Sequence, residues 1–167
     1  NPAPNEVVLG DIVAFTADTD RIANLPDFEL LTGGFPCQTF SMMGKKAGFN
    51  EERGQMFFHI MNILEVKRPR YVLLENVKNL LNHDKGKTLA RIIKVLEQTG
   101  YHVYHNIYNT VDFHLPQKRN RLVIFATLDC VNDDWMRKHF TPQNVQATFD
   151  AVFHRLSPQH YSSVNEI

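Results

Sequence analysis

Strand-like and helix-like segments alternate along this chain, and the alternation restricts its fold more than any other feature of the sequence. Short apolar runs typical of buried strands are followed by stretches whose apolar residues recur at helical spacing. The predicted strands lie at 7–9, 28–32, 71–74, 102–108 and 122–126, and the predicted helices at 54–67 and 88–99. This order predicts an α/β fold in which helices cover the faces of a mostly parallel sheet.

Two residues mark where the predicted helices end. Pro69 stops the first because proline lacks an amide hydrogen and clashes with the preceding turn. Gly100 stands where a glycine commonly follows the last helical turn. Beyond residue 128 the alternation weakens, and a single further helix is expected at about 145–156.

Bulk composition narrows the classes of protein that remain. The chain has 167 residues, which suits one domain, and its formal net charge is zero, so total charge gives no sign of a polyanionic partner. No apolar run approaches the ~20 residues of a membrane span. The two cysteines make no disulfide framework and, like the eight histidines, show no metal-ligand spacing, so we expect free thiols and no metal.

Three chemically active side chains come directly after predicted strands: Asp11, Cys37 and Glu75. Ligands of open α/β sheets bind beyond the carboxyl ends of the strands, so this placement predicts a site there. A thiol followed by the Gly- and Lys-bearing segment 39–50 suits a nucleophile. Other interpretations remain open, because most free cysteines are small buried hydrophobes and a strand-end glutamate often pairs with a lysine. Cys130 is expected to be inert.

Five motifs in a fixed order resemble those of the DNA cytosine-5 methyltransferase family. They are Gly-Asp-Ile at 10–12, Gly-Phe-Pro-Cys-Gln at 34–38, Gly-Gln-Met-Phe-Phe at 54–58, Glu-Asn-Val at 75–77 and Gln-Lys-Arg-Asn-Arg at 117–121. The resemblance covers roughly residues 7 to 128. It implies the Rossmann-like fold of S-adenosylmethionine-dependent methyltransferases and the transfer of a methyl group to C5 of cytosine.

The resemblance also implies roles for four catalytic residues. Cys37 would be the nucleophile that attacks C6 of the base, and Glu75 would contact N3 and the exocyclic amine. Arg121 would bind O2 of the cytosine. Arg119 would support the nucleophile and a nearby phosphate.

Binding roles follow from the same family motifs. On the cofactor side, S-adenosylmethionine would meet Asp11, Ile12, Pro36 and Met56, although a Gly-Asp turn is also common without any ligand. The substrate would be double-stranded DNA with its target base flipped out of the stack. The residues expected to contact this DNA are Gln38, Ser41, Lys45 and Arg53.

The sequence departs from the family pattern at both ends. We find no Phe-x-Gly-x-Gly cofactor loop before residue 7 and no target-recognition region after residue 128. We therefore expect 1–128 to be a partial catalytic domain and 129–167 a connection toward a missing recognition region. The chain would be an excised fragment, a subunit of a split enzyme that needs a complementing segment, or a degenerate relative.

Two alternatives to a DNA methyltransferase remain open at the level of sequence. One is the tRNA-directed branch of the same family, which shares the Cys, Glu and Arg motifs. The other is a non-catalytic regulatory relative that keeps the fold. The compact motif block favours a bacterial cytoplasmic protein, and a eukaryotic one would be nuclear.

Overall fold

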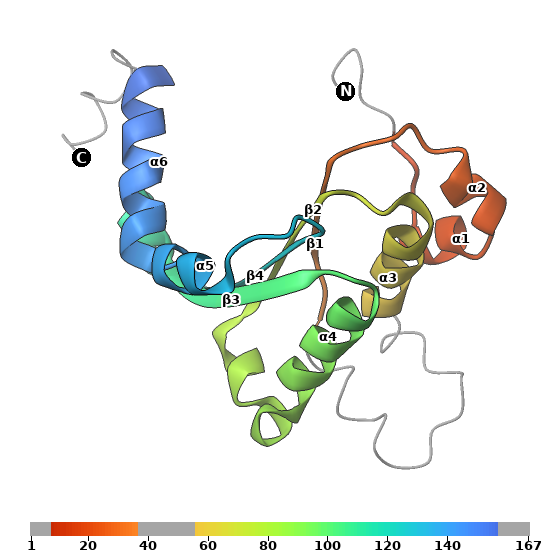
Figure 1. Cartoon of the computed structure of the whole chain (residues 1–167), viewed down its shortest axis with the longest axis horizontal. Coiled ribbons are helices and arrows are strands. Elements are labelled where there is room, and N and C mark those ends of the chain that lie inside the picture. Colours follow the sequence, from red (N-terminus) through yellow and green to blue (C-terminus); the bar gives the residue numbers. More distant parts are fainter. Residues whose placement is uncertain (1–7, 37–55, 157–167) are drawn as a thin grey trace.

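The computed structural model describes residues 8–36 and 56–156, apart from the side chains of 153–156. Within these residues one four-stranded sheet has the order β1-β2-β4-β3 (Figure 1). Its strands are β1 (Leu30–Gly34), β2 (Tyr71–Val77), β3 (His102–Asn109) and β4 (Asn120–Thr127). The α/β class expected from the alternating pattern is confirmed.

The sheet is mixed, whereas the sequence predicted a mostly parallel one. β1 pairs with β2 in parallel, but β4 runs antiparallel to both β2 and β3. Three strands therefore point one way, and the reversed β4 lies between two of them. The reason is the connection from β3 to β4, which holds only the short 3₁₀ turn η5 (Thr110–Phe113) and no crossover helix. A connection of this kind joins antiparallel neighbours.

The strand predicted at 7–9 is wrong for the part that the structure describes. Residues 8 and 9 have no strand pairing, and both side chains are exposed. Gly10 then turns the chain with a φ of +82°, and Asp11 begins a helix. Asp11 therefore follows a turn and caps a helix, and it does not stand at the end of a strand.

Two long helices cover one face of the sheet. They are α3 (Met56–Lys67) and α4 (Lys87–Gln98), close to the helices predicted from periodicity. Between β2 and α4 the chain makes two 3₁₀ turns, η3 (Lys78–Leu81) and η4 (His83–Gly86). Gly100 follows α4 with a φ of +93°, as its position predicted.

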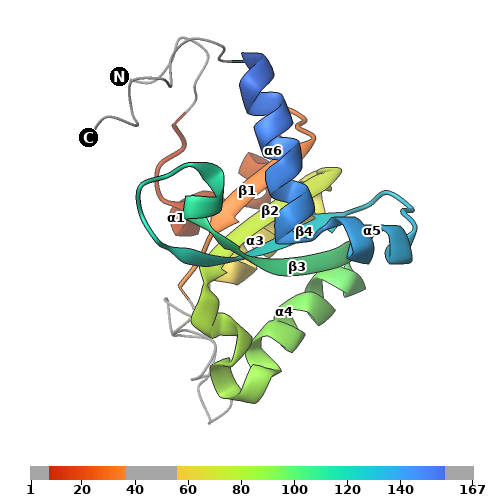
Figure 2. The ribbon, with the colours of Figure 1, turned by 90° about the vertical axis from the view of Figure 1, so that its left-hand side faces the viewer.

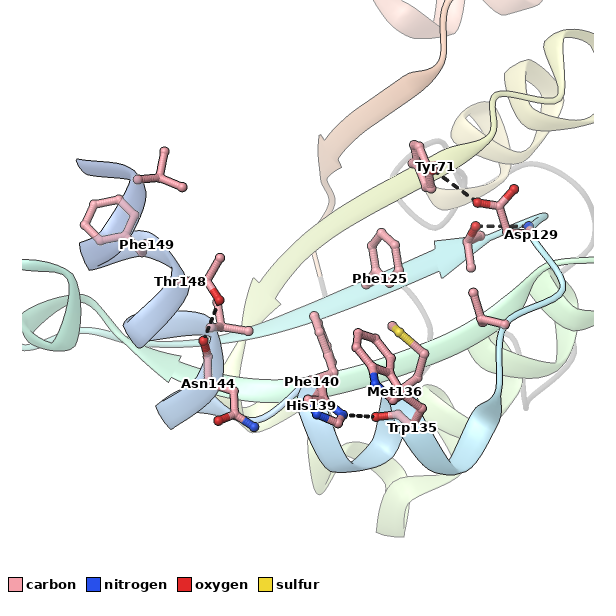
Figure 3. A pocket seen from close by; sticks show the side chains of 14 residues that line it. Tyr71, Phe125, Asp129, Trp135, Met136, His139, Phe140, Asn144, Thr148 and Phe149 are labelled. Carbon is pink, nitrogen blue, oxygen red and sulfur yellow. Dashed lines mark hydrogen bonds between the residues drawn. The ribbon is translucent and has the colours of Figure 1, made fainter. Parts of the chain in front are cut away.

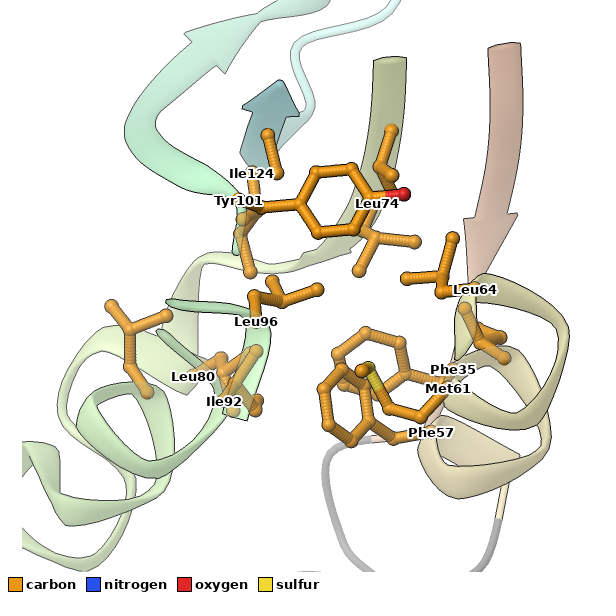
Figure 4. Close-up of a cluster of buried hydrophobic side chains, with 14 of the residues drawn as sticks. Phe35, Phe57, Met61, Leu64, Leu74, Leu80, Ile92, Leu96, Tyr101 and Ile124 are labelled. Carbon is orange, nitrogen blue, oxygen red and sulfur yellow. The ribbon is translucent and has the colours of Figure 1, made fainter. Parts of the chain in front are cut away.

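The hydrophobic core lies between these helices and the sheet. Apolar side chains alternate along β2, so that Val72 and Leu74 are fully buried against the helices. Leu64 of α3 and Ile92 of α4 meet them there, together with Ile124 of β4 (Figure 4). The same alternation places Glu75 on the opposite face of the sheet, away from this core.

Four further helices were missed or underestimated from sequence. They are α1 (Ile12–Thr16), α2 (Thr19–Ala23), α5 (Asp133–His139) and α6 (Pro142–Leu156), of which only the last was expected in part. The first three are too short to show periodicity. Their sequence signals are capping side chains, Asp11, Asp18 and Asn132, each of which accepts a backbone amide.

Helices α5 and α6 lie over the face of the sheet that α3 and α4 leave uncovered (Figure 2). Between them and the sheet runs an apolar groove of about 780 Å³ (Figure 3). Its walls include Phe125 of β4, Phe140 after α5 and Phe149 of α6. The boundary expected at residue 128 stays a prediction. Among the described residues, no helix has the length and apolarity needed to cross a membrane.

Candidate active site

Sequence-distant residues meet in a cleft of about 310 Å³ at one end of the sheet. The end of β1, the end of β2 and the beginning of β4 come together there, because β4 runs opposite to β2. The residues that line the cleft are Phe35, Pro36, Glu75, Asn76, Val77, Arg119 and Arg121. The structure therefore brings together four residues that the motifs selected independently: Pro36, Glu75, Arg119 and Arg121.

Glu75 and Arg121 form an ion pair within this cleft. In the antiparallel ladder Glu75 faces Val123 and Val77 faces Arg121, so the two charged side chains are diagonal neighbours on one face. Arg121 Nε contacts Glu75 Oε1, and Arg121 Nη1 donates to the carbonyl of Asn120 at 3.1 Å. The Glu75 side chain is 50% exposed and that of Arg121 23% exposed. The Glu75 carboxylate is thus accessible to a ligand, while the Arg121 guanidinium is held in place by the carbonyl of Asn120.

Asn76 joins the end of β1 to β2 through its buried amide. Its Nδ2 donates to the carbonyl of Phe35 at 2.6 Å, and its Oδ1 accepts from the amide of Val77 at 2.9 Å. Asn76 has no role assigned from the sequence motifs. The signal was available, because Asn76 follows Val72 and Leu74 on the inward face of the strand, where an apolar residue is expected. A polar side chain that is buried at such a position is expected to form hydrogen bonds.

Arg119 approaches the cleft from the segment before β4. Its backbone is tied twice to Thr110: the Thr110 amide donates to the Arg119 carbonyl at 3.0 Å, and the Arg119 amide donates to Thr110 Oγ1 at 3.1 Å. These bonds fix the backbone position from which the Arg119 side chain extends. Thr110 is a second residue that sequence reasoning missed, since only the contact identifies it.

Three of the four residues predicted for the cofactor side lie at the beginnings of two helices, and the fourth, Pro36, lines the cleft. Asp11 caps α1, where its Oδ1 accepts from the amide of Val13 at 3.0 Å. Ile12 is the first residue of α1 and Met56 the first of α3. Both are partly buried and pack against the hydrophobic cluster that contains Phe35. The structure thus places Ile12 and Met56 on the cluster that also supports one wall of the cleft.

Five predicted site residues fall outside the described part of the chain, and their roles stay predictions. They are Cys37, Gln38, Ser41, Lys45 and Arg53. Pro36, the residue directly before Cys37, nevertheless lines the cleft. Among residues 8–36 and 56–156, no group of three or more His, Cys, Asp or Glu side chains could hold a metal ion.

Comparison with known proteins identifies the family. The family described as C-5 cytosine-specific DNA methylase matches residues 2–165. Type II methyltransferase M.HaeII of Haemophilus aegyptius is 50% identical over 148 residues, which are 87% of this chain and 45% of that protein. Type II methyltransferase M.DsaV of Dactylococcopsis salina is 48% identical over 124 residues, which are 74% of this chain and 34% of that protein.

A solved structure agrees with the sequence relatives. The crystal structure of the S. pombe Dnmt2 methyltransferase superposes with a TM-score of 0.52 and 28% identity, covering 67% of this chain and 36% of that one. The expected methyltransferase fold, incomplete in this chain, is thereby confirmed. The chain spans less than half the length of these relatives. Because the family match extends over nearly all of its residues, this chain belongs to the C-5 cytosine-specific DNA methylase family.

Proposed function

We propose that this chain is the base-attacking part of a DNA cytosine-5 methyltransferase. One observation carries the proposal: Glu75 and Arg121 form an ion pair in a cleft that is also lined by Pro36, which precedes Cys37 in the chain. A carboxyl and a guanidinium side by side can bind the N3 edge and the O2 atom of one cytosine. A thiol beside them would stand near C6 of the same ring.

The proposed reaction begins when the Cys37 thiolate forms a bond to C6 of a flipped cytosine. The displaced electrons move toward N3, which Glu75 would contact together with the exocyclic amine and so lower the barrier. Arg121 holds O2, and Arg119 faces the nucleophile and a phosphate. C5 then carries the electron density needed to take a methyl group. Water then takes the C5 proton, and the electrons of that C–H bond re-form the C5–C6 double bond and expel the Cys37 thiolate, which releases 5-methylcytosine.

S-adenosylmethionine would supply the methyl group from its sulfonium. The residues on the cofactor side fit the adenine end of this molecule. The exposed Asp11 uses Oδ1 to cap α1, and Oδ2 takes no part in that cap, so it can accept from an exocyclic amine. Ile12 and Met56 offer partly buried apolar surface for an aromatic ring. Pro36 would complete the pocket.

Duplex DNA is the proposed substrate. Extruding a base costs a few kcal/mol, which contacts to the backbone must offset. Gln38, Ser41, Lys45 and Arg53 would supply these contacts, and lysine and arginine are suited to phosphates. The bacterial sources of M.HaeII and M.DsaV support a bacterial cytoplasmic location.

A complementing methyltransferase segment is the proposed partner. In the described residues β1 pairs only with β2, so its other edge presents backbone groups without a neighbouring strand. Leu30 on β1 is 51% exposed, and Leu73 and Val77 on β2 are also exposed apolar side chains. An apolar surface beside an open strand edge suits a further strand and the helix that covers it.

Covalent trapping tests the proposed function. Duplex DNA containing 5-fluorocytosine should form an adduct with this chain when S-adenosylmethionine and the flanking segments of M.HaeII are added. Cys37→Ala should abolish the adduct, and Cys130→Ala should leave it unchanged. An adduct that survives Cys37→Ala would refute the assigned nucleophile. Trapping on 5-fluorocytosine tRNA in place of duplex DNA would refute the assigned substrate.

A further inference from the structure

A buried histidine joins the two helices that carry the proposed cofactor residues. His59 lies on α3, is 9% exposed, and has its Nδ1 2.6 Å from Oγ1 of Thr16 at the end of α1. Thr16 Oγ1 also donates to the carbonyl of Ile12 at 2.9 Å. A polar chain therefore runs from α3 through Thr16 to the first residue of α1.

The hydrogen-bond directions in this chain are determined by elimination. A hydroxyl has one hydrogen, and the Ile12 carbonyl can only accept it. Nδ1 of His59 must then donate to Thr16, so Nδ1 of this ring carries a hydrogen. Its Nε2 is buried and has no hydrogen-bond partner among the residues that the structure describes. The ring is thus held on one side only, by Thr16.

Helix α1 depends on such contacts for its position. It has five residues, and helices of that length are not stable in water alone. Within the described residues, the bond to His59 is the polar side-chain link between α1 and α3. Phe15 adds a buried apolar contact. The place of Asp11 and Ile12 relative to Met56 therefore depends on the bond between Thr16 and His59.

We infer that His59 and Thr16 are positioning residues for S-adenosylmethionine. They would hold the amine-binding Asp11 and the apolar Ile12 at a fixed place relative to Met56, without touching the cofactor themselves. The inference rests on the proposed function, because it assumes that these residues bind the adenine end. It adds two residues that none of the sequence motifs assigned.

Two Thr16 variants and one control separate positioning from general stability. Thr16→Val keeps the shape and removes the hydroxyl, whereas Thr16→Ser keeps the hydroxyl. Tyr101→Phe removes another buried hydroxyl bond, from Tyr101 to the carbonyl of Pro69 at 2.7 Å, which lies beyond the last residue of α3 and does not involve α1.

Two measurements are made on each variant. Hydrogen exchange of the Phe15 amide, which donates to the Asp11 carbonyl at 2.9 Å, reports on α1 in the chain alone. Calorimetry reports S-adenosylmethionine binding to the chain complemented with M.HaeII segments. Thr16→Val should speed the exchange and weaken binding about fivefold, equivalent to about 1 kcal/mol. Thr16→Ser and Tyr101→Phe should leave both near wild type.

The outcomes distinguish this inference from the proposed function. Binding that Thr16→Val leaves unchanged would refute the positioning role alone. Equal weakening by Tyr101→Phe would also refute it, since general destabilisation would then suffice. Failure of the complemented wild-type chain to bind S-adenosylmethionine would refute the proposed function and the positioning role with it.

Discussion

The amide of Asn76 should control both the stability of the sheet and the approach to the nucleophile. Its orientation is determined by its partners, because the Val77 amide can only donate and the Phe35 carbonyl can only accept. Asn76→Leu keeps the number of side-chain heavy atoms and removes both hydrogen bonds. Asn76→Asp keeps the shape but replaces the donor Nδ2 with a carboxyl oxygen.

The expected cost of Asn76→Leu follows from the two contacts. Asn76 is 3% exposed, and the bond to Phe35 is buried, so the unpaired carbonyl costs about 1–3 kcal/mol. The partly buried Val77 amide costs about 1 kcal/mol more. The added apolar groups return about 1 kcal/mol. We expect the free energy of unfolding to fall by about 1–3 kcal/mol.

Asn76→Asp makes the prediction depend on pH. Only a protonated carboxyl can donate to the Phe35 carbonyl, so the fold should raise the pKa of the introduced group above its unfolded value of about 3.9. Both states are neutral below that value, and the variant is then closest to wild type. As the pH rises, the unfolded state ionises first, so stability is lost up to the pKa of the folded state.

Urea denaturation from pH 4 to pH 7 measures this effect, and trapping with 5-fluorocytosine DNA measures its consequence. The difference between Asn76→Asp and wild type should grow with pH, whereas that of Asn76→Leu should stay constant. Adduct formation should slow in both, since the segment before Cys37 loses its hold on β2. A loss below about 0.5 kcal/mol in Asn76→Leu, or a pH-independent Asn76→Asp, would refute the reasoning, because such values match an ordinary surface site.

Three further predictions concern the site and the core. Glu75→Gln should change the free energy of unfolding by less than about 1 kcal/mol, because half of the Glu75 side chain in the pair with Arg121 is exposed. The same variant should slow trapping by about 10²-fold or more. Trapping at the wild-type rate would contradict the role of Glu75. Tyr108→Phe should raise the melting temperature, since the Tyr108 hydroxyl is buried without a partner in the described part of the chain. Burial raises the pKa of Tyr108 from 10.0 to about 12, so the unfolded state ionises first and the folded state loses stability as the pH rises through that interval. Tyr108→Phe should therefore reduce alkaline unfolding measured by circular dichroism. Leu64→Ala, at a fully buried site, should cost about 2–5 kcal/mol in urea denaturation, and a smaller loss would contradict the described core.

The sequence predicted the centres of the strands well and their functional ends poorly. Apolar runs at 71–74 and 122–126 identified β2 and β4, but the structure extends β2 to Val77 and begins β4 at Asn120. Most of the omitted residues are polar, and several of them line the cleft, so the apolar pattern stops where the cleft begins. At these ends, hydrogen bonds to the neighbouring strand maintain the strand conformation. The sequence of one segment does not show which segment that neighbour is.

The residues of the candidate site were likewise predicted only in part. Glu75, Arg119 and Arg121 could be selected because their motifs stand in a recognisable order. Thr110 could not be assigned a role, since it acts through a contact to the backbone of Arg119. The inward-facing Asn76 signalled a buried hydrogen bond, but the sequence did not show that its partner is Phe35. The short helices were missed because five to seven residues are too few to show a period, although a cap such as Asp11 marks the start of α1.

The strand direction that the sequence argument misjudged is also what assembles the site. Arg121 lies near the beginning of β4 and Glu75 near the end of β2, and the antiparallel pairing makes them diagonal neighbours. In a parallel pairing, the beginning of β4 would lie beside the beginning of β2. At about 3.3 Å per residue, the two charged groups would then be separated by more than ~10 Å and could not grip one base. The mixed sheet is therefore a requirement of the proposed chemistry, because it alone brings the arginine to the carboxylate.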